Sequence, residues 1–476
     1  MTKARLITTL ALVLSIPFVA FAQPGASTID LPATPVGVAV RLFVAALNSG
    51  SQAALEKFHT DRGGSAENAG PDLEFAQQSG GIDLERVLKA SDFEIEVEAK
   101  TRKGGQAVIL LFAVEPKAPH AVADIGVRPA GGRGPSGPGA PAGSNAPAGR
   151  SADQIVAGAP EVVDRAIATG FSGVVVIARD GKPVLERAAG LAHRGFGVPN
   201  RIDTKFNLGS INKTFTRLAI AQLMQAGKLS LDDTLGRHLP DFPNADAAAK
   251  VTIAHLIDMK SGLGDFFGPD FDAVSKSRVR TLADYLPFFA KKPLAFEPGT
   301  AQAYSNGGYV TLGLIIEKVT GQTYFDYVRE NIFKPAGMND TDAYPLDAPT
   351  PNLAVGYTKG GVSNIYTLPA RGSSAGGGYS TAPDLLRYAE AVLANRLASP
   401  AHTAWYLGGE RPAAGAQPAS DNATRQTRGG LGVAGGSPGV NGVLEINAAN
   451  RLVIVVLSND DPPAAETLGR KIRSGS

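Results

Sequence analysis

The sequence predicts an α/β protein of the α+β type, built as one large and one small domain. Strand-like segments lie at both ends of the large block, and the stretch between them is mostly helical. The run at 131–150, made almost entirely of Gly, Pro, Ala and Ser, divides the chain and is expected to be a linker. A length of 476 residues allows two or three domains, at about 150 residues each.

The first 22 residues are typical of a secretory leader. Lys3 and Arg5 give a basic start, residues 6–19 form an apolar stretch, and residues 20–22 (Ala-Phe-Ala) form a small-residue cleavage site. An uncleaved anchor is the alternative, but the apolar run is interrupted and is shorter than the ~20 residues of a membrane span. We therefore expect an exported protein, periplasmic or secreted, that begins at Gln23 and has no later membrane span.

Composition excludes several classes of function. The chain carries 46 Lys and Arg against 44 Asp and Glu, and the two cations in excess belong to the leader, so a nucleic-acid partner is not indicated. The absence of cysteine excludes disulfides, thiolate metal sites and a cysteine nucleophile. We expect no metal and no cofactor, and the sequence favours no oligomeric state. Six histidines show neither metal-ligand spacing nor a triad context: His59, His120, His193, His238, His255 and His402.

Residues 29–130 are expected to form a small α+β accessory domain, because helical patterns come first and strands follow. The expected elements are helices at Thr34–Leu47 and Ser51–Phe58 and strands at Phe93–Ala99 and Ala107–Val114. This segment resembles the cone-shaped folds of nuclear transport factors and ketosteroid isomerase, without a motif that would carry their function. A docking or stabilising role is therefore favoured over a second active site.

The large domain, 151–476, is expected to open with a helix at Ala152–Thr169. A hairpin follows, with strands at Val174–Ala178 and Pro183–Arg187 around Asp180-Gly181. The chain closes with a second antiparallel pair, Gly442–Ile446 and Leu452–Leu457. Since the two pairs come from distant parts of the sequence, we expect one antiparallel sheet that brings them together.

Ser210 and Lys213 form the only Ser-x-x-Lys in the chain, at the start of an apolar helix expected at Ile211–Met224. Gly209 precedes this helix and Gly227 is well placed to end it. Free N–H groups at a helix start favour developing negative charge, and burial of Lys213 would lower its pKa and make it a base for the serine. The competing interpretation is a capping serine and a surface lysine.

Tyr304 and Asn306 lie in a Gly-rich loop before a helix expected at Tyr309–Val319. A neighbouring lysine would favour the phenolate form of Tyr304, and the amide of Asn306 could hold that lysine and a substrate carbonyl. Taken alone, a tyrosine and an asparagine in such a loop are more often simple turn residues.

Several stretches agree in order and spacing with one known superfamily: "FNLGSINKTFT", "LSLDDTL", "SGLGDF", "FEPGTAQAYSNGGY", "SSAGGGYSTAPDLLRY" and "GGSPGVNGVLEI". Over roughly Phe171 to Pro463 the chain resembles the serine β-lactamase and penicillin-binding superfamily, closest to its class C, β-lactamase-related esterase and D-aminopeptidase branch. The resemblance implies a β-lactamase/transpeptidase-like fold, with a central antiparallel sheet flanked by helices and a helical subdomain. It further implies Ser210 as nucleophile, Lys213 and Tyr304 as the base pair, and Asn306 as a substrate-binding side chain.

The third motif of that superfamily, KTG or HxG, aligns with Val433-Ala434-Gly435, so the side chain expected to meet a substrate carboxylate is absent. The N–H of Gly436 would still form an oxyanion hole with that of Ser210, and Gly435 would line the same site. Met259 stands where this branch usually has histidine, and we expect a structural role for it. Residues 435–439 also fit GxSxG, the elbow of α/β-hydrolases, but Pro438 lacks the required N–H and strand-like sequence follows.

The resulting prediction is a serine hydrolase that forms an acyl-serine on a small-molecule carboxylic ester or a short D-residue peptide or amide. β-Lactamase or penicillin-binding activity on D-Ala-D-Ala is the alternative within the same chemistry. A non-catalytic, penicillin-recognising module of the cell envelope is the alternative from another class, which the missing third motif leaves open.

Overall fold

The computed structural model describes residues 29–115, 118–129, 150–412 and 429–475, which group into two compact units, Met1–Ala130 and Gly131–Ser476. The predicted leader and nearly all of the predicted linker lie outside the described residues. No helix in the described part of the chain is long and apolar enough to cross a membrane.

The N-terminal unit is a four-stranded antiparallel sheet, in the order β1-β2-β3-β4, with three helices. Its core joins Phe43 of α1 and Phe58 of α2 to Phe112 of β3. The predicted strands and helices of this segment are present, whereas β1, β4 and α3 had not been expected. The elements are α1 (Pro35–Ser49), α2 (Gln52–Asp61), α3 (Ala69–Ser79), β1 (Ile82–Ala90), β2 (Glu94–Thr101), β3 (Ala107–Val114) and β4 (Val122–Pro129).

The C-terminal unit is built around a five-stranded antiparallel sheet in the order β11-β12-β13-β5-β6. Strand β13 pairs with β5, so Val455 lies opposite Val176 across almost three hundred residues of sequence. This pairing confirms the predicted single sheet. The strands are β5 (Gly173–Arg179), β6 (Lys182–Ala189), β7 (Leu191–His193), β8 (Val198–Pro199), β9 (Phe206–Asn207), β10 (Tyr379–Ser380), β11 (Gly430–Ser437), β12 (Val440–Asn447) and β13 (Leu452–Ser458).

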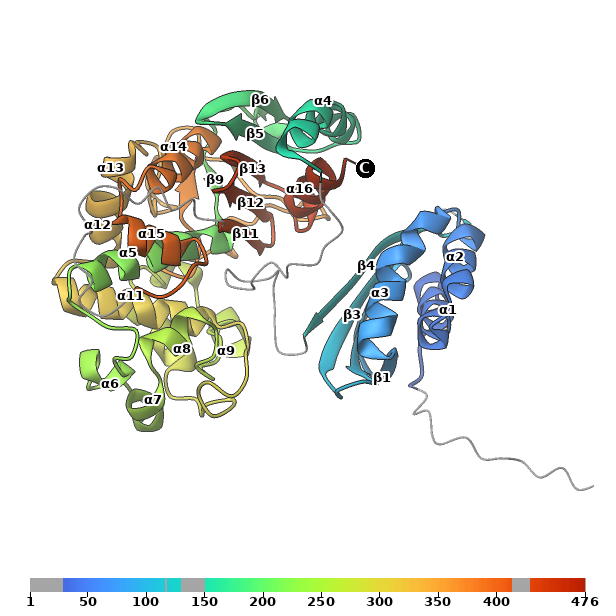
Figure 1. The fold of residues 1–476 in the computed structure, drawn as a ribbon, viewed down its shortest axis with the longest axis horizontal. Helices are drawn as coiled ribbons and strands as arrows, with labels where there is room; N and C mark the ends of the chain where they lie inside the picture. The colour runs from blue at the N-terminus through green and yellow to red at the C-terminus, as the bar shows by residue number, and fades with distance from the viewer. Residues whose placement is uncertain (1–28, 116–117, 130–149, 413–428, 476) are drawn as a thin grey trace, which may run out of the picture. The chain divides into compact units, whose positions relative to one another are not determined.

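Helices cover both faces of this sheet, because alternate residues of its apolar strands point to opposite sides. Val175 and Ile177 pack with α4 and α16, which lie together beside the sheet in Figure 1, whereas Val174 and Val176 face the larger helical layer. The helices are α4 (Ala152–Ala168), α5 (Asn212–Gln225), α6 (Leu235–His238), α7 (Ala245–Lys250), α8 (Ile253–Ile257), α9 (Pro269–Asp272), α10 (Leu286–Phe289), α11 (Asn306–Thr320), α12 (Tyr324–Val328), α13 (Lys334–Ala336), α14 (Ala382–Leu393), α15 (Pro400–Tyr406) and α16 (Ala464–Ser474).

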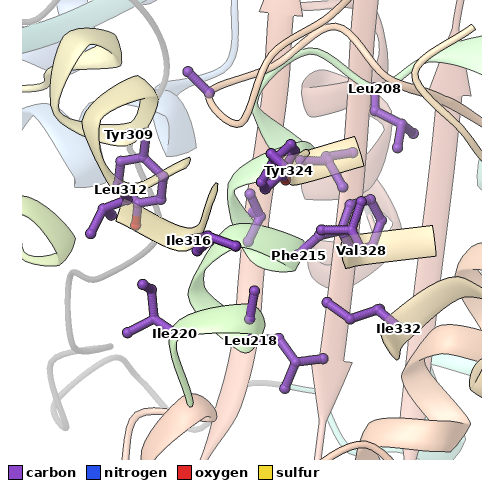
Figure 2. Packing of buried hydrophobic residues seen from close by; sticks show 14 of the residues in the cluster. Leu208, Phe215, Leu218, Ile220, Tyr309, Leu312, Ile316, Tyr324, Val328 and Ile332 are labelled. Atoms are coloured by element: carbon purple, nitrogen blue, oxygen red, sulfur yellow. The ribbon is translucent and has the colours of Figure 1, made fainter. Parts of the chain in front are cut away.

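Helix α5 is buried nearly all round, as its apolar composition predicts. Figure 2 shows Phe215, Leu218 and Ile220 of α5 among side chains of α11 and α12. Gly227, with a left-handed φ of +65°, follows the last turn, as expected. The two candidate motifs, Ser-x-x-Lys at the start of α5 and Tyr-x-Asn at the start of α11, are therefore held by helices that pack into the core.

Candidate active site

Ser210 lies in a 3-10 turn, Gly209–Ile211, that leads directly into α5. The turn is set by Gly209, which has a left-handed φ of +49° and donates its N–H to Asn207 Oδ1 at 2.9 Å. A side chain at Gly209 would also place its Cβ 2.8 Å from the backbone nitrogen of Gly436. Only glycine therefore lets β11 approach the serine this closely.

Lys213 is fully buried one turn further on, and its Nζ has three oxygen neighbours. Nζ donates to Asn306 Oδ1 at 2.7 Å and to the carbonyl of Ala375 at 2.5 Å, and it lies 3.1 Å from Ser210 Oγ. The first two neighbours are carbonyl oxygens, which only accept hydrogen bonds. A neutral amine would spend its two N–H bonds on them and direct its lone pair at the hydroxyl of Ser210.

Tyr304 reaches the same serine from the loop before α11, with its hydroxyl 2.6 Å from Ser210 Oγ. Ser305 caps α11 by accepting the N–H of Gly308 at 2.8 Å, which starts the helix at Asn306, three residues earlier than predicted. The buried Met259 holds the loop, because its sulfur accepts the N–H of Ser305 and its carbonyl accepts that of Ala303. Met259 thus has the structural contacts expected of it.

Asp265 fixes the orientation of Asn306. Asn306 Nδ2 donates to Asp265 Oδ2 at 2.7 Å, so the opposite end of the amide, Oδ1, faces Lys213. Ser305 Oγ also donates to the carbonyl of Gly264, which ties the segment containing Asp265 to the start of α11. The sequence reasoning missed this carboxylate, although it lies inside the quoted stretch "SGLGDF".

Burial moves the pKa values of the two titratable neighbours of Ser210 in opposite directions. Burial lowers the pKa of Lys213 to about 7, against a smaller raising effect of the Asp265 charge. Burial raises the pKa of Tyr304 above its ordinary value, and the hydrogen bond with Ser210 only partly offsets this. The expectation that the lysine would favour the phenolate of Tyr304 is therefore wrong, because the loss of hydration dominates and the nearby charge of Asp265 also raises the pKa of Tyr304.

Gly435 and Gly436, at the end of edge strand β11, lie against the backbone at Ser210. A Cβ on Gly435 would come within 2.8 Å of the Ser210 nitrogen. The carbonyl of Gly435 accepts a hydrogen bond from the side chain of Asn441 on β12. Since the peptide is trans, its other end, the N–H of Gly436, points away from β12. Gly436 also lines the cavity in front of Ser210.

The remaining sequence candidates lie outside this cluster. Val433 is buried in the main core and is not among the residues that line the cavity. Ser437 lines the cavity, but a turn and strand β12 follow it, as predicted, instead of the helix of a hydrolase elbow. None of the six histidines lines the cavity.

The cavity has a volume of about 590 Å³ and opens beside Ser210, Tyr304 and Asn306. One side is an aromatic wall of four residues, Phe266, Phe267, Phe271 and Tyr285. The loop at 373–377 contributes Ala375, whose carbonyl holds Lys213, and Gly377, whose N–H donates to the carbonyl of Gly209. The sequence of this loop, "SSAGGG", predicts no role for it, because a hydrogen bond to a backbone carbonyl does not depend on the residue type.

A Ser-x-x-Lys helix start and a Tyr-x-Asn loop, set between an antiparallel sheet and a helical layer, define the β-lactamase/transpeptidase-like class of folds. The beta-lactamase family model matches residues 153–475, more than half of the chain, and the chain therefore belongs to the beta-lactamase family.

Two curated relatives and one solved structure illustrate the range of similar proteins. Penicillin-binding protein 4* of Bacillus subtilis is 35% identical over 204 residues, 42% of this chain and 44% of that protein. Esterase EstB of Burkholderia gladioli is 33% identical over 257 residues, 47% of this chain and 65% of that protein. The matched region spans less than two thirds of either relative. A penicillin-binding protein from Bacillus halodurans, 30% identical, matches 66% of this chain and 98% of its own with a TM-score of 0.56.

Proposed function

We propose that this chain is a serine hydrolase that acts through an acyl-serine intermediate at Ser210, with Lys213 and Tyr304 as proton carriers. The observation that carries the proposal is the surroundings of Lys213 Nζ, where two carbonyl oxygens take two N–H bonds and the third neighbour is the serine hydroxyl. With a pKa of about 7, Lys213 is present as the neutral amine in a large share of molecules near neutral pH.

In the first step, Ser210 Oγ attacks the substrate carbonyl carbon and its proton passes to the lone pair of Lys213. The carbonyl oxygen becomes an oxyanion, for which the N–H groups of Ser210 and Gly436 are the proposed donors. Asn306, held by Asp265, keeps the amine aligned. Gly435 supports the hole through its close packing against Ser210.

In the second step, the bond between the carbonyl carbon and the leaving group breaks, and the leaving oxygen or nitrogen takes a proton. Tyr304 is the proposed donor, because its raised pKa keeps the phenol protonated and its hydroxyl already contacts Ser210 Oγ. The proton on Lys213 then restores the phenol. Water attacks the acyl-serine by the same route in reverse and releases the acid.

The proposed substrate is a carboxylic ester or a short D-residue peptide or amide. One relative is named an esterase, which supports ester chemistry, and another is named a penicillin-binding protein, which supports the alternative of penicillin recognition. β-Lactamase or D-Ala-D-Ala activity ranks lower, because Val433 supplies no group for a carboxylate. Steady-state assays with nitrophenyl esters, D-alanyl amides and a chromogenic cephalosporin test this order. Fast cephalosporin turnover without esterase activity would reverse it.

The rival, a non-catalytic binding module, is tested by a fluorophosphonate probe and mass spectrometry. A hydrolase should be labelled stoichiometrically at Ser210, with the label lost in Ser210→Ala. A binding module should not be labelled at all. The hydrogen-bonded Ser210, Lys213 and Tyr304 favour the hydrolase, since a module that only recognises ligands has no use for a buried amine beside a hydroxyl.

We also propose that the protein belongs to the class C-related branch, is exported after cleavage behind Ala22, and is periplasmic or secreted. The basic and apolar leader pattern supports export. We propose the division predicted from sequence, with residues 29–130 as an accessory docking or stabilising domain and 151–476 as the hydrolase domain. Amino-terminal sequencing of the mature protein should begin at Gln23, and retention of the leader would contradict export by cleavage.

A further inference from the structure

The cavity beside Ser210 has walls that suit an apolar group. The rings of Phe266 and Phe267 lie 4.5 Å apart and those of Phe266 and Tyr285 lie 4.6 Å apart, so the aromatic wall is continuous. Leu346 and Leu368 also line the cavity. Its volume of about 590 Å³ is within the range of about 300–1,000 Å³ usual for small-molecule sites.

Positive charge is scarce along this cavity. Of the lining residues that the structure describes, Lys276 is the one Lys or Arg. Its Nζ donates to the backbone carbonyls of Phe271, Asp272 and Val274, at 2.5, 3.3 and 3.0 Å, and lies 4.4 Å from the centre of the Phe271 ring. An ammonium has three N–H bonds, so Lys276 has none left for a ligand.

Negative charge in the cavity is confined to its exposed part. Asp272 lines the cavity but is exposed, so water screens its attraction for a cationic ligand. A carboxylate that enters beside the aromatic wall would lose its hydration without gaining a charged partner, which is strongly unfavourable. The cavity therefore offers no strong partner to a charged substrate, and it disfavours a negatively charged substrate more than a positively charged one.

We propose that the cavity selects uncharged carboxylic esters that carry an aryl or medium-length alkyl group next to the ester carbonyl, and that it rejects substrates with a carboxylate there. This inference rests on the proposed hydrolase function and narrows it. It favours uncharged esters over short D-residue peptides with free termini, because both termini are charged and the C-terminal carboxylate would find no charged partner if it entered the cavity.

A matched pair of substrates tests the charge rule in the full-length protein. The 4-nitrophenyl hemisuccinate and its methyl ester differ by one capped carboxylate and have nearly the same length. The capped ester should be turned over with a kcat/KM at least about tenfold higher, mainly through a lower KM, because the loss is one of binding. Equal kcat/KM values for the two substrates would overturn the inference.

The aromatic wall is tested at Phe267, which lines the cavity and is 45% exposed, so its truncation leaves the core intact. Phe267→Ala should reduce the preference for 4-nitrophenyl phenylacetate over the acetate about fivefold or more. Phe196→Ala is the control, since Phe196 is 81% exposed and does not line the cavity, and it should keep the wild-type preference. An unchanged preference in Phe267→Ala would overturn the role of the wall.

Failure of the inference is distinguishable from failure of the proposed function. If neither esters nor D-residue amides are hydrolysed and a fluorophosphonate does not label Ser210, the hydrolase proposal fails, and the charge rule is then tested by binding alone. Phenylboronic acid should stabilise the protein in a thermal shift assay at a lower concentration than 4-carboxyphenylboronic acid. The reverse order, or no difference, would overturn the charge rule whatever the catalytic activity.

Discussion

The polar cluster of Ser210, Lys213, Tyr304 and Asn306 and the aromatic wall face the same cavity but are built on different principles. In the polar cluster nearly every contact is a directed hydrogen bond, and Lys213 Nζ uses each of its three oxygen neighbours in the proposed mechanism. The aromatic wall is held mainly by ring contacts, with centroids 4.5 to 6.2 Å apart. The comparison predicts that one atom changed in the polar cluster slows the reaction by orders of magnitude, whereas a change in the wall mainly adjusts selectivity.

The largest expected effect is that of Ser210→Ala. Without the nucleophile, hydrolysis of a nitrophenyl ester should fall by at least about 10⁴-fold, to the level that binding alone provides. Ser437→Ala is the matched control, because Ser437 also lines the cavity and is the serine of the GxSxG match at residues 435–439. Fluorophosphonate labelling should vanish in the first variant and persist in the second. Labelling that moves to Ser437 would show that the nucleophile is wrongly assigned.

Lys213→Ala should lower kcat/KM by about 10²- to 10⁴-fold, the usual contribution of a general base. The fold should survive, since the variant removes a buried amine that is costly to charge. Lys228→Ala, at an exposed position just beyond α5, controls for the loss of a lysine. Steady-state kinetics at pH 8 distinguishes the two, and full activity in Lys213→Ala would remove the amine from the mechanism.

Tyr304→Phe should cost about 10²-fold in kcat/KM, because the proton for the leaving group must then come from water or from Lys213. The effect should shrink for esters of good leaving groups such as nitrophenol, which need little protonation. Tyr366→Phe, with 87% of Tyr366 exposed, is the control. Equal losses for good and poor leaving groups would contradict the proposed role as proton donor.

Sequence reasoning found the four polar residues because they occupy short motifs at the starts of α5 and α11, and a buried helix fixes the direction of its first turn. It missed Asp265, whose function depends on a contact across 41 residues, and Ala375, which acts through a backbone carbonyl. Strand β1 was missed because "IDLERVLKA" alternates only in its first residues and is otherwise largely exposed. The protonation of Tyr304 was misjudged because burial cannot be weighed before the fold is known.

Asp265→Asn should change the pH dependence more than the maximal rate. The substituted amide can still accept the hydrogen bond from Asn306, but the charge that raises the pKa of Lys213 is gone. The pKa of Lys213 should therefore fall further, and the rising limb of kcat/KM should move to lower pH by up to about one unit. Asp272→Asn, which removes an exposed carboxylate, should leave the limb in place. A shift to higher pH in Asp265→Asn would contradict this role.

The smallest expected effect is that of an apolar substitution in the cavity lining, outside the polar cluster. Leu346→Ala should lower kcat/KM for phenylacetate esters by about tenfold or less, because a few lost methylene contacts cost little transition-state binding. The value for acetate should change less than that for phenylacetate. A uniform drop for both esters would show that Leu346 supports the structure of the site and does not determine its selectivity.

The central claim is that Lys213, as a neutral amine, takes the proton of Ser210. The most direct test is the second-order rate of fluorophosphonate labelling at Ser210, followed by mass spectrometry across pH 5 to 10. Because the pKa of Lys213 is lowered to about 7, the rate should rise with pH through a midpoint near 7 and level off above it. A rate that does not change across this range, or a midpoint near the ordinary lysine value of about 10, would contradict the account.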